Sequence, residues 1–231
     1  MRTDAQWRCA LSVALVLMVL SGCSTTRNDS VTNSPMPTYS GESVVVMARS
    51  YHTGNKTESD FTRCIVNELR SGQNKLNIMR GEDFIDAMYP WFEPRTAPND
   101  IGDMPRLIQN EKVAARMRET GVRYVVWLDG NTEMPGGGGS ISCAAGAGAA
   151  GCFGFAWWEN DSDYDAAVWD LDGQKEAGSL ETKVNGTSYL PAIVIPIPLI
   201  ARTRAKACDA LAEQLQQFIR SGSAVPSVAE N

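Results

Sequence analysis

The chain of 231 residues is acidic, with 21 lysines and arginines, 27 aspartates and glutamates, and a formal net charge of −6. This balance argues against a nucleic-acid partner, because binding a phosphate backbone requires a basic patch. It also argues against a polybasic membrane surface. The hydrophobic content of 43% is sufficient for the core of one domain of ordinary size.

The first residues indicate export and lipid attachment. Arg2 and Arg8 give the chain a positively charged start. They precede an apolar run, Ala10–Leu20, which is shorter than the roughly 20 residues of a membrane-spanning helix. The run ends in Leu20-Ser21-Gly22-Cys23, which resembles the lipobox of bacterial lipoproteins, where a peptidase cuts before a lipid-modified cysteine. The resemblance implies a signal peptide at 1–22 and an acyl (palmitate) anchor on Cys23. The alternatives are an ordinary secretory peptide with a chance cysteine and an uncleaved membrane helix.

The residues after the lipobox indicate which membrane carries the protein and how the rest of the chain is divided. Ser24, in place of an aspartate, favours the periplasmic face of the outer membrane. Residues 23–41 are rich in Ser, Thr, Asn and Pro and are expected to be a disordered tether. Residues 42–220 are expected to form a single periplasmic domain, followed by a flexible tail at 221–231.

Four cysteines remain after Cys9 in the leader and Cys23 are set aside, and an even number in an oxidising compartment indicates two disulfides. Three connectivities are possible. We favour Cys143–Cys152, which closes a short Gly/Ala loop, and Cys64–Cys208, which would join two amphipathic helices. Zinc is the rival explanation, but the chain has no CxxC and one histidine, so we expect no metal and no cofactor.

Strands and helices alternate in the first half of the chain. The hydrophobic patterns predict strands at Ser43–Ala48, Lys75–Met79 and Val122–Leu128, and helices at Asp60–Arg70, Gly81–Met88 and Pro105–Thr120.

The second half changes to β structure. The glycine-rich stretches Pro135–Ser140 and Ala144–Gly151 are expected to be flexible or tightly turned. Beyond a short strand at Phe155–Trp158, the dipeptide Asp172-Gly173 predicts a hairpin. Its strands would be Tyr164–Leu171 and Lys175–Val184, and a closing helix would span Arg204–Arg220.

The apolar segment Leu190–Ile200 carries three prolines, which argue against a central strand or a helix. It is predicted to be an edge strand or an extended strap, either buried against the sheet or exposed for docking. The candidate partner-binding residues are Leu190, Ile193, Ile195, Ile197 and Leu199, with Trp91 from a proline-bounded aromatic segment.

Other motifs are weak. Residues 146–151 match GxGxxG without the strand and helix that a dinucleotide site requires. Asp161, Asp163, Asp165 and Asp172 resemble part of a calcium loop that lacks its glycine. His52 is the single histidine and has no patterned nucleophile beside it. No catalytic residue is singled out.

The order of elements predicts an α/β (or α+β) fold: a mixed sheet in two or three layers, with flanking helices and a C-terminal helix. This layout resembles the small α/β domains of envelope lipoproteins of the curli-secretion type, of peptidoglycan-synthase activators, and of the amino-terminal domain of the Tol-system periplasmic protein. The segments YPWFEP, GFAWW and GTSYLPAIVIPIPLIA resemble those of a group of proteobacterial lipoproteins.

The favoured interpretation is an outer-membrane lipoprotein that acts as a non-enzymatic binding, assembly or regulatory factor of the cell envelope, with an envelope protein or polymer as partner. The alternatives are an envelope hydrolase with an unrecognised site and an oligomeric secretion component. The sequence leaves the oligomeric state open.

Overall fold

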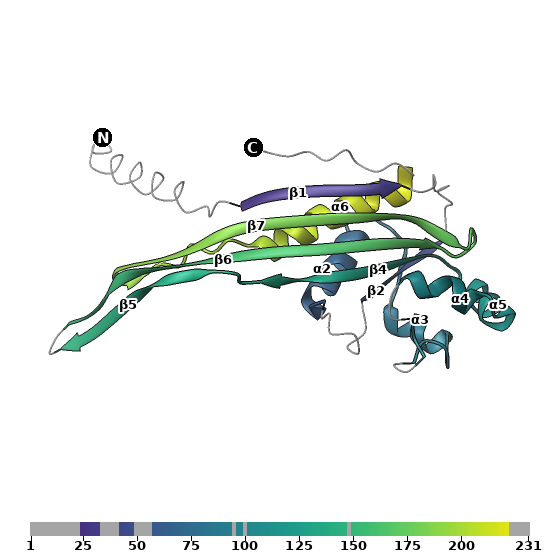
Figure 1. The fold of residues 1–231 in the computed structure, drawn as a ribbon, viewed down its shortest axis with the longest axis horizontal. Helices are drawn as coiled ribbons and strands as arrows, with labels where there is room; N and C mark the ends of the chain where they lie inside the picture. The colour runs from purple at the N-terminus through teal and green to yellow at the C-terminus, as the bar shows by residue number, and fades with distance from the viewer. Residues whose placement is uncertain are drawn as a thin grey trace, which may run out of the picture. The chain divides into compact units, whose positions relative to one another are not determined.

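The computed structural model describes residues 24–32, 42–48, 57–93, 96–98, 101–146 and 149–221. The chain divides into two compact units. Unit 1 comprises residues 1–25, 133–161 and 185–203, and unit 2 comprises residues 26–132, 162–184 and 204–231. Two long strands, β6 (Ala149–Asp170) and β7 (Lys175–Pro196), contribute residues to both units (Figure 1).

The sheet has seven strands and is mixed. Its order is β1-β7-β6-β4-β2-β3, and β5 pairs with β6 off this path. β2 runs parallel to both β3 and β4, whereas β5 runs antiparallel to β6. The remaining strands are β1 (Ser24–Thr32), β2 (Ser43–Ala48), β3 (Ile78–Met79), β4 (Val122–Glu133) and β5 (Gly137–Gly146).

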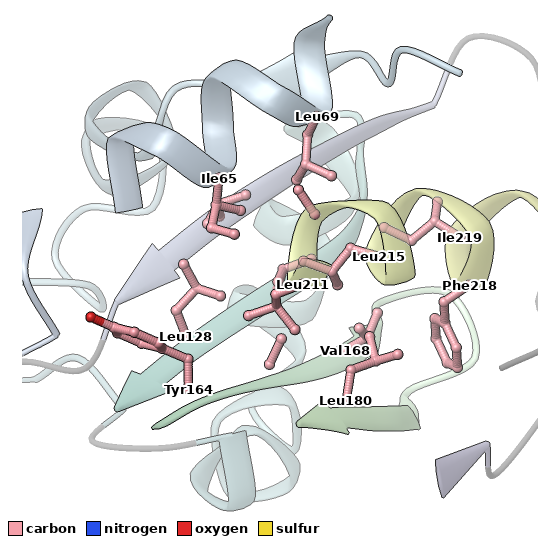
Figure 2. Close-up of a cluster of buried hydrophobic side chains, with 14 of the residues drawn as sticks. Ile65, Leu69, Leu128, Tyr164, Val168, Leu180, Leu211, Leu215, Phe218 and Ile219 are labelled. Carbon is pink, nitrogen blue, oxygen red and sulfur yellow. The ribbon is translucent and has the colours of Figure 1, made fainter. Parts of the chain in front are cut away.

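One face of the sheet in unit 2 packs against α2 (Ser59–Arg70) and the closing helix α6 (Thr203–Ser221). Ile65 and Leu69 of α2 meet Leu211, Leu215 and the end of α6 over the strands (Figure 2). The side chains that reach this core from the strands alternate along each strand, as the pleat requires: Val44, Val46, Tyr124, Val126, Leu128, Tyr164, Ala166, Val168 and Leu180.

The opposite face carries a second core under three short helices. These are α3 (Gly81–Ala87), α4 (Met104–Ile108) and α5 (Glu111–Glu119), with a 3-10 turn at Ile101–Asp103. Val45, Val125 and Trp127 point to this side, between the residues that face the first core. Unit 2 is therefore a three-layer α/β/α arrangement, and the fold class predicted from the sequence is confirmed.

Three predicted features are present at nearly the expected positions. Strand Ser43–Ala48 is β2, the helix expected at Asp60–Arg70 is α2, and the turn at Asp172-Gly173 joins β6 to β7. The strands around that turn are longer than predicted, because the pairing continues from unit 2 into unit 1.

Three predictions were wrong. Ser24–Thr32, expected within the tether, is strand β1 beside β7. The helix expected at Pro105–Thr120 is divided into α4 and α5, because the Asn110 side chain accepts a hydrogen bond from Lys112 N (3.1 Å) and begins a new helix. The glycine-rich stretches form β5 and the start of β6.

Among the described residues, no helix has both the length and the apolar character needed to cross a membrane.

Candidate docking surface

Unit 1 is built on the antiparallel pairing of β5 with the first part of β6. The register places Gly137 opposite Trp158 and Gly146 opposite Ala149. Cys143 lies directly opposite Cys152, and their disulfide joins the two strands. The backbone groups of β5 that face β6 are thereby paired within the hairpin.

Glycine is required at two places in this hairpin. Gly139 and Gly154 have φ values of 102° and 147°, which L residues rarely adopt. A Cβ atom on Gly139 would lie 2.1 Å from the Phe155 carbonyl oxygen, and one on Gly154 would lie 2.2 Å from that of Ser140. The glycines therefore allow the two backbones to approach closely, as at β-bulges.

The apolar strap Leu190–Ile200 folds back on itself. Tyr189 and Leu199 exchange two backbone hydrogen bonds, of 2.8 and 2.7 Å, and Ile197 N donates to Pro191 O at 3.0 Å. Val194 takes a positive φ of 81° at the bend. The strap is thus the end of β7 together with a short return segment, and it presents a hairpin tip at residues 192–196.

Ser188 fixes the base of the strap. Its buried hydroxyl oxygen accepts a hydrogen bond from Asn160 Nδ2 on β6 and another from Ala201 N on the return segment, both at 3.0 Å. One side chain therefore ties together three segments of unit 1.

The two hairpins lie side by side. The rings of Phe155 on β6 and Tyr189 on β7 are in contact, with centroids 6.0 Å apart. A Cβ atom placed on Gly151 would lie 3.7 Å from Val194 Cα, so the tip of the strap rests against β6. The two hairpins are therefore in contact within unit 1.

Unit 1 carries most of the exposed apolar side chains. Eleven large hydrophobic side chains of the described residues are exposed, and nine of them belong to unit 1. Phe153 and Ile193 are each 77% exposed, and Ile195 is 69% exposed. We call the following residues the apolar surface: Met134, Phe153, Phe155, Tyr189, Ile193, Val194, Ile195, Ile197 and Ile200.

The sequence around the apolar surface carries no charged residue. Residues 134–158 and 184–201 include no Asp, Glu, Lys, Arg or His, although 21% of the whole chain is charged. Exposed apolar patches of this kind mark sites of interaction with proteins, ligands or membranes. The arrangement can bind an apolar partner.

The predicted partner-binding residues divide into three groups. Ile193, Ile195 and Ile197 are exposed, whereas Leu190 and Leu199 are half-buried beside them. Trp91 belongs to unit 2, where it packs against the second core and lines a cavity of about 350 Å³ with Asp103 and Arg106, among others. It therefore has no place in the apolar surface.

Sequence reasoning missed Phe153, Phe155 and Tyr189. The sequence predicted a strand at Phe155–Trp158 but did not single out these aromatic side chains as exposed. Two phenylalanines at alternate positions next to a glycine-rich stretch without charges were the available signal for an exposed strand face.

Both favoured disulfides are present. Cys64 on α2 and Cys208 on α6 are bonded, with Cα atoms 6.3 Å apart, and Cys143–Cys152 has Cα atoms 4.0 Å apart. Asp209 lies near the first pair, but sulfurs bonded to each other are not thiolate ligands for a metal.

The acidic residues considered for calcium do not form a loop. Asp161, Asp163 and Asp165 lie on strand β6, and Asp163 makes an ion pair of 3.2 Å with Lys183. Asp172, in the turn after β6, pairs with Arg123. The lipobox Cys23 and the candidate His52 lie outside the described residues.

No protein-family model matches the chain, and no curated protein matches its sequence. Its solved structural neighbours include the PelC dodecamer from Paraburkholderia phytofirmans, at 14% identity and a TM-score of 0.41, covering 86% of this chain and 99% of that one. A point variant of the same dodecamer matches at 13% identity and a TM-score of 0.41, covering 84% and 96%.

Proposed function

We propose that the chain is an outer-membrane-anchored periplasmic lipoprotein that acts as a non-enzymatic binding or assembly factor of the cell envelope. Its lipid anchor would be Cys23, and its apolar surface would engage an envelope component. The observation that carries the proposal is the concentration of exposed large hydrophobic side chains in unit 1, nine of eleven among the described residues.

The geometry supports a binding role because the apolar side chains stand on a fixed backbone. The β5–β6 register, the Cys143–Cys152 disulfide and the two hydrogen bonds to Ser188 Oγ hold both hairpins. A surface held in this way loses little conformational freedom on binding, which favours affinity. The hydrolase alternative rests on His52, which lies outside the described residues, and no observation favours it.

In-cell crosslinking, followed by purification of the lipidated protein, tests the proposal. Ile195→Asp places a charge on the apolar surface, and Val31→Asp places the same charge on an exposed aliphatic residue of unit 2. We expect one recurrent envelope component with the wild type and with Val31→Asp, and its loss with Ile195→Asp. The same recovery from all three folded proteins would refute the proposal.

A further inference from the structure

We propose that the component covering the apolar surface is the hydrocarbon of a lipid bilayer, into which the strap tip and the β5–β6 hairpin insert from the water side. This inference deepens the proposed function and rests on it. It adds a second membrane contact, made by side chains of the folded chain and separate from the lipid on Cys23.

The first support is the distribution of charge. The ionisable residues that bracket the apolar segments are Glu133 and Glu159 for the β5–β6 hairpin, and Lys183 and Arg202 for the strap. Glu159 N donates to Gly136 O, which places Glu159 at the base of its hairpin, away from the end at Gly146 and Ala149. Charges are excluded from hydrocarbon, and here they are absent from the parts that would enter it.

The second support is the backbone pairing between the segments. Hydrocarbon offers no hydrogen-bonding partner, so each backbone pair made within the inserted segments lowers the cost of insertion. The β5–β6 register continues from Gly137–Trp158 to Gly146–Ala149. The strap pairs Tyr189 with Leu199 and Ile197 N with Pro191 O. Its prolines have no N–H group to leave unpaired.

The third support is the position of the aromatic residues with polar atoms. Trp157 and Trp158 are half-buried and sit next to Glu159, between the charged base and the exposed Phe153 and Phe155. Tyr189 contacts Phe155 at the start of the strap. Trp and Tyr are enriched where a protein crosses from water into the apolar part of a membrane.

A second copy or another protein fits this surface less well. Protein interfaces combine an apolar centre with a polar rim and about one hydrogen bond per 100–200 Å². Within residues 134–158, apart from the tryptophans and the bonded cysteines, the polar side chains are Ser140 and Ser142. A surface with so few donors and acceptors matches the chemistry of lipid chains.

Fluorescence quenching of the full lipidated protein in phosphatidylethanolamine–phosphatidylglycerol vesicles tests the inference. Ile195→Trp places a reporter at the strap tip, and Val31→Trp places one on an exposed residue of unit 2. Each variant is compared with the wild type, in vesicles with and without brominated acyl chains and with iodide in the water. Brominated lipid should quench the added signal at 195 and leave the signal at 31 unchanged. Iodide should quench the signal at 31 and leave the signal at 195 unchanged.

Three outcomes overturn the inference. Quenching of the residue-195 signal by iodide and not by brominated lipid would show that the tip lies in water. Protection from both quenchers that is lost on dilution across more vesicles would show that a second copy covers it. Protection from both at every dilution would show that the tip packs on its own chain.

Failure of the membrane-insertion inference would not by itself refute the proposed function. A protein or polymer that is recovered with the wild type and lost with Ile195→Asp would keep the binding role and change its partner. If that recovery is also unaffected, the proposed function fails as well.

Discussion

The Tyr164 hydroxyl donates a 2.7 Å hydrogen bond to Glu58 Oε2, joining strand β6 to the residue that precedes helix α2. The other Glu58 oxygen accepts from Thr132 N of β4 at 2.9 Å. The ring of Tyr164 stacks on that of Phe61, with centroids 3.5 Å apart. This cluster ties α2 to the strands of unit 2, from which β4 and β6 continue into unit 1.

Replacing Tyr164 by Phe should destabilise unit 2 while keeping the ring stack. The change removes the donor to the half-buried Glu58 carboxylate, and an unsatisfied group of this kind costs about 1–3 kcal/mol. Urea unfolding measures the loss. Tyr89→Phe, at an exposed tyrosine, is the control and should change stability by less than about 0.5 kcal/mol. Equal midpoints for the two variants would contradict the role given to the hydroxyl.

The pKa of Asp165 is raised to about 6, first by partial burial and then by the carboxylates of Glu181, Asp163 and Asp129. The folded protein therefore binds this proton more tightly than the unfolded chain does. Stability should fall as pH rises from about 4 through 6, because the unfolded carboxylate ionises first.

Asp165→Asn should remove this penalty, so its gain over the wild type should be present at pH 7 and absent at pH 4. The Asp165 side chain is only partly buried, and solvent screening keeps the gain below about 1 kcal/mol. Urea midpoints at several pH values provide the measurement. A gain that is the same at pH 4 and pH 7 would exclude the ionisation as its cause.

The two disulfides should differ in their contribution to stability. Cys64–Cys208 closes a separation of 144 residues and Cys143–Cys152 one of 9. Loop-closure entropy in the unfolded chain gives about 5 kcal/mol for the first and about 3 kcal/mol for the second. Unfolding of Cys64→Ala/Cys208→Ala and Cys143→Ala/Cys152→Ala proteins tests the order. A larger loss from the second pair would show that unit 1 depends on its bond for reasons beyond chain entropy.

Ser188→Ala should loosen the strap without unfolding unit 2. The change leaves Asn160 Nδ2 and Ala201 N without their acceptor, at a cost of about 1–3 kcal/mol for each buried group. Hydrogen exchange of the Ala201 amide should accelerate, while the core amides of β2 and β4 stay protected. Unchanged exchange at Ala201 would mean that Ser188 does not hold the strap.

Much of unit 2 was predictable because its residues follow simple periodicities. The β-branched run of β2, the amphipathic spacing of α2 and the Asp172-Gly173 turn are local signals that the tertiary packing reinforces. The break at Asn110 was missed, since a capping side chain inside an apolar periodicity is read as one more helical residue.

Unit 1 was less predictable, for physical reasons. Glycine has low strand propensity, so residues 137–146 and 149–151 carry no local preference for the strands they form. Their conformation is set by pairing with β6, the cross-strand disulfide and the close approaches at Gly139 and Gly154. The sequence singles out the exposed isoleucines of the strap. It does not predict the contact between Phe155 and Tyr189, because that contact forms between two different strands.

The most direct test of the apolar surface is photocrosslinking in cells from a benzophenone-bearing residue placed at position 195, with position 31 as the matched control. The account predicts adducts between position 195 and an envelope component, with lipid as the adduct if the tip is inserted in a bilayer, and none from position 31. Equal labelling from the two positions, or no adduct at 195 in a folded and lipidated protein, would contradict it.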